Sequence, residues 1–210
     1  MIEDGIRVLG HASIRLEKER KVIYIDPYKV EERHDADVIF CTHPHYDHFS
    51  ETDILRLKKD STKLVVVRES YEDALKMGFN EEDVVVAEIG KNGEVAEISF
   101  SVIPSYNVMK PFHPKGKQWV GYLLTLDGIR YYIAGDTDKI PEMESISCDV
   151  AFLPVGGTYT MNAQNAAEAA NLIKPKIAIP IHFGSIVGTR KDAEEFVKNL
   201  ETGIIGKIFD

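Results

Sequence analysis

The stretch His43-Pro-His-Tyr-Asp-His48 decides the fold of this chain of 210 residues. It places three imidazoles and one carboxylate within six positions, directly after the apolar run Val38-Ile-Phe-Cys41. Imidazole nitrogens and carboxylate oxygens are the ligands of catalytic zinc and related divalent ions. In an extended loop the first two histidines point to the same side and can hold one metal ion, while the aspartate and the last histidine turn toward a neighbouring position. The alternative is a chance cluster of surface histidines, which would arise about once in a few thousand shuffled chains of this composition.

Length and composition indicate one soluble globular domain over residues 1–210. Hydrophobic residues make up 44% of the chain and charged residues 28%, which is ordinary for such a domain. The net charge of −9 argues against nucleic-acid binding, because phosphate neutralisation needs clustered lysines and arginines. The N-terminus has no secretory signal pattern, and no apolar run is long enough to span a membrane. We therefore expect a cytoplasmic protein with no nucleic-acid partner and no membrane association. The sequence does not define its oligomeric state.

The first half of the chain is predicted to be rich in short strands. Glycine or charged turns separate the first three of them, which predicts an antiparallel meander. Ser50 and Asp53 form a capping-box pattern at the start of a short helix. The predicted strands are Ile6–Leu9, Ser13–Glu17, Lys21–Ile25, Val38–Cys41, Leu64–Val67 and Val84–Ile89, and a second helix is predicted over Tyr71–Met77.

The second half repeats this order of strands followed by helices. Asp127-Gly128 predicts a tight turn between two strands. Apolar residues three and four apart predict two helices, one over Ala163–Ile173 and one through Ala193 and Leu200. The order indicates the α/β (α+β) class, with two packed sheets and helices outside them, and leaves several topologies open. The predicted strands are Val95–Pro104, Val120–Leu126, Ile129–Ala134, Asp149–Val155 and Ile177–Ile181.

Further metal ligands are expected from segments distant in the sequence. Asp136 directly follows an apolar run, and a buried carboxylate there is costly unless it is paired or bound to a metal ion. His182 also follows an apolar run and is a candidate ligand in the company of the hexapeptide. His113 lies in a loop with prolines on both sides, and His11 lies at a strand junction. Each of these last two is either a site residue or an ordinary histidine.

The order His43-x-His45-x-Asp47-His48, then Asp136 in a Gly-Asp-Thr setting, then His182, resembles the metallo-β-lactamase superfamily. Within it, the chain resembles the stand-alone metal-dependent hydrolases related to the ascorbate-phosphate lactonase branch. The resemblance implies a four-layer αββα sandwich, the metallo-β-lactamase fold, with the metal ions between the open edges of the two sheets. The segments that carry the closer likeness are Gly10-His-Ala-Ser13, Ala134-Gly-Asp-Thr137 and Leu153-Pro-Val-Gly-Gly-Thr-Tyr-Thr160.

The resemblance also implies roles for individual residues. His43 and His45 look like ligands of a first metal ion, and Asp136 looks like a carboxylate that bridges two ions. The ligands of the second ion look like Asp47, His48 and His182.

One element departs from the family pattern. The superfamily usually places another first-site histidine between the hexapeptide and the bridging aspartate, whereas this chain has Ser105-Tyr-Asn107 after the corresponding strand. Three alternatives follow. Asn107 serves as an amide-oxygen ligand, or His113 folds back to supply the nitrogen, or the first site is weak and the enzyme works with one metal ion.

These ligands lead us to expect a hydrolase that uses a metal-activated water on a small ester, lactone or phosphodiester. Its cofactor is expected to be one or two zinc ions, with manganese, nickel or iron as alternatives. Asp47 is expected to orient the nucleophile and accept a proton, while His113 or His11 protonates the leaving group or binds the substrate.

Four loop residues are expected either to line the substrate pocket or to be ordinary loop residues: Tyr106, Lys110, Lys115 and Tyr159. Two other functions remain open on the same fold, a metal-binding module without turnover and a mono-iron dioxygenase.

Overall fold

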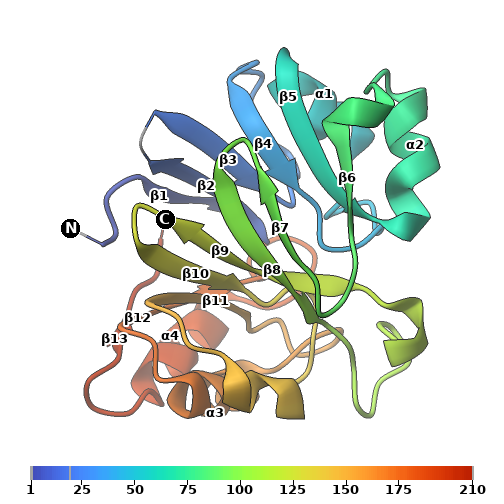
Figure 1. The fold of residues 1–210 in the computed structure, drawn as a ribbon. Coiled ribbons are helices and arrows are strands. Elements are labelled where there is room, and N and C mark those ends of the chain that lie inside the picture. Colours follow the sequence, from blue (N-terminus) through green and yellow to red (C-terminus); the bar gives the residue numbers. More distant parts are fainter. Residues whose placement is uncertain (1, 19, 210) are drawn as a thin grey trace.

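The computed structural model describes residues 2–18 and 20–209, and two β-sheets face each other with helices on their outer sides (Figure 1). The strands of the first sheet lie in sequential order, antiparallel from β1 to β3 and parallel from β3 to β6. Its six strands are β1 (Ile6–Gly10), β2 (Ser13–Lys18), β3 (Lys21–Ile25), β4 (Ala36–Phe40), β5 (Lys58–Val67) and β6 (Val84–Ala87).

The second sheet follows the same plan. It is antiparallel from β7 to β10 and parallel from β10 to β13, again with the strands in sequential order. Its seven strands are β7 (Asn92–Val95), β8 (Ile98–Pro104), β9 (Val120–Leu126), β10 (Ile129–Ile133), β11 (Val150–Pro154), β12 (Ile177–Ile181) and β13 (Ile205–Gly206).

In the described chain, α-helices make four of the six parallel crossovers and cover the outer face of each sheet (Figure 1). Four α-helices are present in the described part of the chain: α1 (Glu51–Leu57) and α2 (Tyr71–Lys76) on the first sheet, and α3 (Ala163–Ile173) and α4 (Arg190–Lys198) on the second. Short 3-10 turns occupy Arg68–Ser70, Glu81–Asp83, Lys115–Lys117 and Pro141–Ser145. No helix in the described residues has the length and apolar character that a membrane crossing requires.

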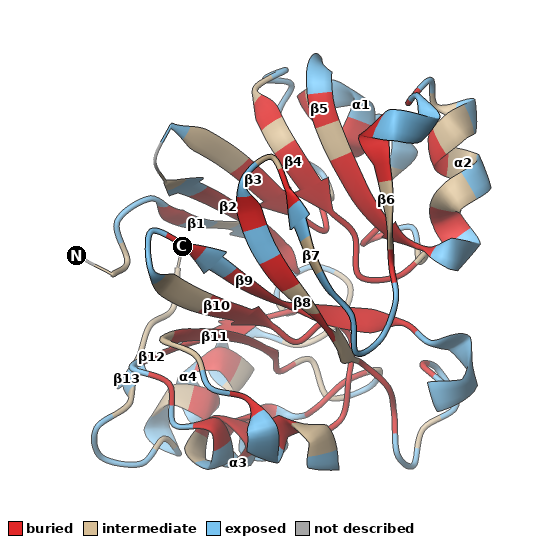
Figure 2. Ribbon diagram, in the orientation of Figure 1, coloured by how far each residue is buried: buried red, intermediate tan, exposed pale blue. Residues whose placement is uncertain are grey.

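The largest buried cluster lies between the two sheets, where the facing residues are buried (Figure 2). The alternation of side chains along a strand produces this layer. In β4, Val38 and Phe40 point between the sheets, while Ile39 points toward α1 and α2. Phe40 meets Phe100 and Tyr122 of the other sheet edge-on, with ring centroids 5.5 and 5.1 Å apart. The αββα sandwich predicted from the sequence is thereby confirmed.

Most predicted elements agree with the structure to within one or two residues, and two do not. The predicted strand Val95–Pro104 is wrong, because Ala96 and Glu97 form the tight turn of a hairpin between β7 and β8, with φ of 47° and 68°. Hairpin turns of this kind usually carry Asn or Gly, so the sequence offered no signal. The predicted strand Leu64–Val67 begins earlier, at Lys58.

Candidate metal centre

The candidate ligands lie in loops that follow strands at one edge of the two sheets. The hexapeptide follows β4, the loop with His113 follows β8, Asp136 follows β10, and His182 follows β12. His11 lies in the turn between β1 and β2. The ligand atoms form groups in which every pair lies within 4.8 Å. We call His43, His45 and His113 the first cluster, and His11, Asp47, His48 and His182 the second cluster.

A buried carboxylate, Asp26, holds the hexapeptide loop in place. Its Oδ1 accepts a hydrogen bond from the backbone N–H of Thr42 at 2.8 Å, and its Oδ2 accepts from the Thr42 hydroxyl at 2.7 Å and from His48 Nδ1 at 2.8 Å. The Thr42 hydroxyl oxygen in turn lies 3.0 Å from Nδ1 of His43 and accepts a hydrogen bond from it. These bonds engage Nδ1 of both histidines and turn their Nε2 atoms toward the candidate ligands. The sequence analysis missed Asp26, which reads only as a strand-ending Asp-Pro pair.

The first cluster consists of three imidazoles. Nε2 of His43 and Nδ1 of His45 face each other at 3.0 Å, and the His113 ring stands edge-on to both. Trp119, the single tryptophan of the chain, is buried against all three rings at centroid distances of 4.8 to 5.5 Å. Its indole N–H donates to Glu69 at 3.0 Å. The indole therefore shields the first cluster from solvent.

His113, rather than Asn107, supplies the third nitrogen of the first cluster. The Asn107 Oδ1 accepts from the His113 backbone N–H at 3.0 Å and lies 3.2 Å from Nδ1 of the same residue. Because an amide oxygen only accepts, Nδ1 carries the proton and Nε2 faces the site. The Asn107 amide group donates to the carbonyl of Tyr159 at 2.9 Å. Asn107 thus orients His113 and ties its loop to the loop that carries Tyr159.

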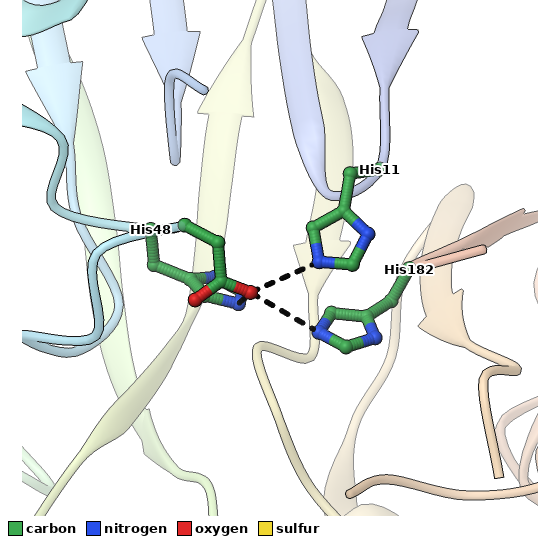
Figure 3. Close-up of side chains that lie close together, drawn as sticks. His11, His48 and His182 are labelled. Carbon is green, nitrogen blue, oxygen red and sulfur yellow. Dashed lines mark hydrogen bonds and ion pairs between the residues drawn. The ribbon is translucent and has the colours of Figure 1, made fainter. Parts of the chain in front are cut away.

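The second cluster joins three histidines from different segments around the Asp47 carboxylate. Figure 3 shows the rings of His11, His48 and His182 converging on one point. Oδ2 of Asp47 accepts from Nε2 of His11 at 3.0 Å and lies 3.6 Å from Nε2 of His48 and 3.9 Å from Nε2 of His182. Burial raises the pKa of Asp47, but the hydrogen bond from His11 and the charge of His48 outweigh it and lower this pKa. Asp47 therefore stays ionised.

His11 and His182 share an uncommon backbone geometry. Both lie in the left-handed region, with φ of 51° and 60°, which few residues other than glycine adopt. The backbone N–H of His182 donates to the carbonyl of His11 at 2.7 Å, and the two ring centroids are 4.0 Å apart. Strained backbone of this kind concentrates at functional sites.

Asp136 lies between the two clusters. Its carboxylate oxygens are 3.3 Å from Nε2 of His48, 3.2 Å from Nε2 of His113 and 3.0 Å from Nε2 of His182. Burial raises the pKa of Asp136, but the charges of His182 and His48 outweigh it and hold this pKa well below its ordinary value. The preceding residue, Gly135, has φ of 67°, and a Cβ there would lie 2.8 Å from the Val120 carbonyl. Only glycine leaves the chain free to turn Asp136 inward.

The two clusters differ in the charge around their imidazoles. In the first cluster burial, reinforced by neighbouring histidines, lowers the pKa of His43 well below its ordinary value and lowers that of His45. In the second cluster burial also lowers the pKa of His48, but the carboxylates of Asp136 and Asp26 outweigh it and raise this pKa well above its ordinary value. The second cluster is thus the more negative environment.

Several buried ring nitrogens fit a metal ion better than any protein partner. Nε2 of His48, His113 and His182 and Oδ1 of Asp136 are buried, yet none of them forms a hydrogen bond. Unpaired buried polar atoms are rare and costly, so a group of four at one point fits a binding site for a cation. Neutral imidazoles and carboxylates suit zinc, manganese, nickel and iron alike.

A cavity of about 260 Å³ opens onto both clusters and Asp136. Tyr159 lines it as expected, whereas Tyr106, Lys110 and Lys115 do not. Lys110 bonds Asp138 and the Thr160 carbonyl, and Lys115 bonds Glu142 and the Tyr106 hydroxyl. His11 does not line the cavity either, which places it behind Asp47 rather than beside a substrate. The sequence analysis missed Phe112 and Ile186, which do line it.

Comparisons with known proteins find relatives among metal-dependent hydrolases and a match to one family model. The family model described as a β-lactamase superfamily domain matches residues 5–182. A UPF0173 metal-dependent hydrolase of Archaeoglobus fulgidus is 31% identical over 90% of this chain and 87% of its own length. A relative of the same name from a Geobacillus strain is 32% identical over 93% and 92%. The crystal structure of a candidate metal-dependent hydrolase from Parabacteroides distasonis is 32% identical, covers 97% of this chain and 91% of its own, and superposes with a TM-score of 0.82.

Proposed function

The chain is a metal-dependent hydrolase that belongs to the metallo-β-lactamase superfamily, and from this premise we propose that it cleaves a small ester, lactone or phosphodiester with a metal-activated water. One observation carries the proposal. Asp136 lies between the two groups of imidazoles, and Nε2 of His48, His113 and His182, drawn from both groups, is buried with no hydrogen-bond partner.

The two clusters would hold two divalent ions, zinc first among them. His43, His45 and His113 would bind the first ion, and Asp136 would bridge the pair. The second ion would be bound by Asp47, His48 and His182. When bound, such ions would lower the pKa of a coordinated water toward neutrality and would polarise the substrate oxygen.

Side chains around the two clusters would position the attacking water and the leaving group. Asp47 is ionised and fixed by His11 at Oδ2, so that Oδ1 can accept the proton of the attacking water. His11 acts through Asp47 as a positioning residue, because it does not reach the cavity. His113 is a ligand in this proposal rather than a proton donor. The phenols of Tyr46 and Tyr159 on the cavity wall can donate hydrogen bonds to the leaving group.

Metal analysis and a substrate panel test this proposal together. Purified protein is expected to contain close to two equivalents of metal and to turn over at least one of a lactone, a carboxylic ester and a phosphodiester. His48→Ala is expected to remove both metal and turnover. His34→Ala is the matched control, because His34 is an exposed histidine whose ring contacts Glu32 and the Lys58 carbonyl and belongs to neither cluster. Metal-replete protein that consumes oxygen, or that turns over none of these substrates, would contradict the proposal.

A further inference from the structure

The walls of the cavity over the candidate metal centre are mostly aromatic and carry no charge apart from the candidate ligands. Apart from the candidate ligands, the side chains that line it are Tyr46, Phe112, Tyr159 and Ile186. Phe112 meets Tyr159 edge-on, with ring centroids 4.7 Å apart and planes at 87°. Phe112 is 41% exposed and Tyr46 is 64% exposed. Large exposed rings that lie beside a cavity are typical of ligand-binding surfaces. These walls can gain buried area when a ligand binds.

The walls also lack positive charge. No lysine or arginine of the described chain is among the residues that line the cavity. Lys110, carried by the same loop as Phe112, is held away by Asp138 and the Thr160 carbonyl. Lys29 stands near the rim, with its Nζ 4.9 Å from the ring centre of Tyr28, which in turn contacts Tyr46. If a cation at the rim attracted anionic substrates, Lys29 could do so. Substitution of Lys29 therefore tests that alternative.

A bound substrate has two parts in this cavity. Its scissile group must reach the ligand clusters at the bottom, and the remainder must then lie against the aromatic walls. A carboxylate or phosphate on that remainder would lose water without gaining a cationic partner, which is costly. An apolar remainder would instead bury surface against the rings. The cavity of about 260 Å³ is small beside usual ligand pockets of about 300 to 1,000 Å³, so the remainder is short.

We propose that the cavity selects substrates whose part away from the scissile bond is short, apolar and uncharged. This inference rests on the hydrolase function proposed above and narrows it. It excludes a sugar-phosphate lactone, whose phosphate is remote from the lactone bond, even though the sequence resembles the ascorbate-phosphate lactonase branch.

A matched pair of esters tests the selection. p-Nitrophenyl valerate and mono-p-nitrophenyl glutarate share the scissile bond, the leaving group and the length of the acyl chain, and differ by a methyl against a carboxylate at its end. The zinc-loaded protein is expected to have a kcat/KM at least about tenfold higher for the valerate ester, equivalent to about 1.4 kcal/mol. Equal values, or a preference for the glutarate ester, would overturn the inference.

Two variants locate the preference in the wall. Phe112→Ala is expected to lower kcat/KM for the valerate ester more than for the glutarate ester, so that the ratio of the two falls, whereas Phe112→Leu keeps an apolar wall and most of the preference. Lys29→Ala is expected to change neither ester. A selective loss of glutarate hydrolysis in Lys29→Ala would show that the rim recruits anionic substrates and would contradict the inference.

A binding measurement separates this inference from the hydrolase function. Pentanohydroxamic acid and glutaric acid monohydroxamate share a metal-binding head and differ in the same way at the tail. Calorimetric titration of zinc-loaded protein is expected to give at least about tenfold tighter binding for the pentano compound. If this preference holds while no ester, lactone or phosphodiester of the panel is cleaved, the substrate classes proposed above fail and the inference stands. If the carboxylated compound binds equally well, the inference fails whatever the esters show.

Discussion

The first and second clusters contain similar ligands in different settings. The first consists of three imidazoles supported by an amide, Asn107, and by the indole of Trp119. The second includes a carboxylate, Asp47, and is supported by a second buried carboxylate, Asp26. Negative charge around a site and in the shell behind it strengthens the binding of divalent cations. We infer that the second cluster binds its metal ion more tightly than the first.

The largest effect is expected at Asp136, the residue the clusters share. Asp136→Asn removes a bridging charge from both at once, so metal content should fall in both clusters. We expect kcat/KM to fall by more than about 100-fold, the upper range for residues that only support ligands. Elemental analysis and ester kinetics measure this, with His34→Ala as the control. A variant that loses metal from one cluster alone would show that Asp136 belongs to that cluster only.

Asp26→Asn is expected to have a smaller effect, which weakens metal binding mainly in the second cluster. The amide removes the charge and one acceptor behind His48, so the second cluster should lose about 10- to 100-fold in metal affinity. The first cluster should change less, because Thr42 separates His43 from Asp26. Competition with a coloured chelator measures both affinities. An equal loss in the two clusters would remove the distinction between them.

The smallest effect is expected from Asn107→Ala, which acts only on the first cluster. Without the amide oxygen, Nδ1 of His113 loses its partner and the ring can rotate, which should weaken the first metal ion by about 10-fold. Asn107→Asp keeps the hydrogen-bond acceptor for His113, so this variant should bind the first metal ion at least as tightly as the alanine variant does. The fluorescence of Trp119 reports the loading of this cluster, because the indole contacts all three of its rings. Equal metal affinity in Asn107→Ala and the unaltered protein would mean that Asn107 does not orient the ligand.

The sequence predicted the second cluster more completely than the first. Spacing within the hexapeptide and the position of His182 after an apolar run made Asp47, His48 and His182 candidate ligands, because ligands at the ends of buried strands leave a local pattern. The role of His11 stayed open. The third imidazole of the first cluster left no such pattern. Its loop folds back through the backbone and side-chain bonds between Asn107 and His113, and this closure cannot be read from composition or spacing.

The supporting residues were the hardest to predict. Asp26 and Trp119 lie far from the hexapeptide in the sequence and come close to it only when the sheets pair and pack. The fold itself was more accessible, since short apolar runs bounded by turn residues defined most strands of both sheets. The hairpin at Ala96 and Glu97 was missed because its residues are not the ones that usually form such turns.

A zinc titration of metal-free protein, followed by calorimetry and by Trp119 fluorescence together, tests the central claim most directly. We expect two equivalents to bind. The first should bind at least about tenfold more tightly with little change in fluorescence, and the second should change the fluorescence as it fills the first cluster. Binding of a single equivalent, or a fluorescence change complete with the first equivalent, would contradict a two-metal centre with a tighter second cluster.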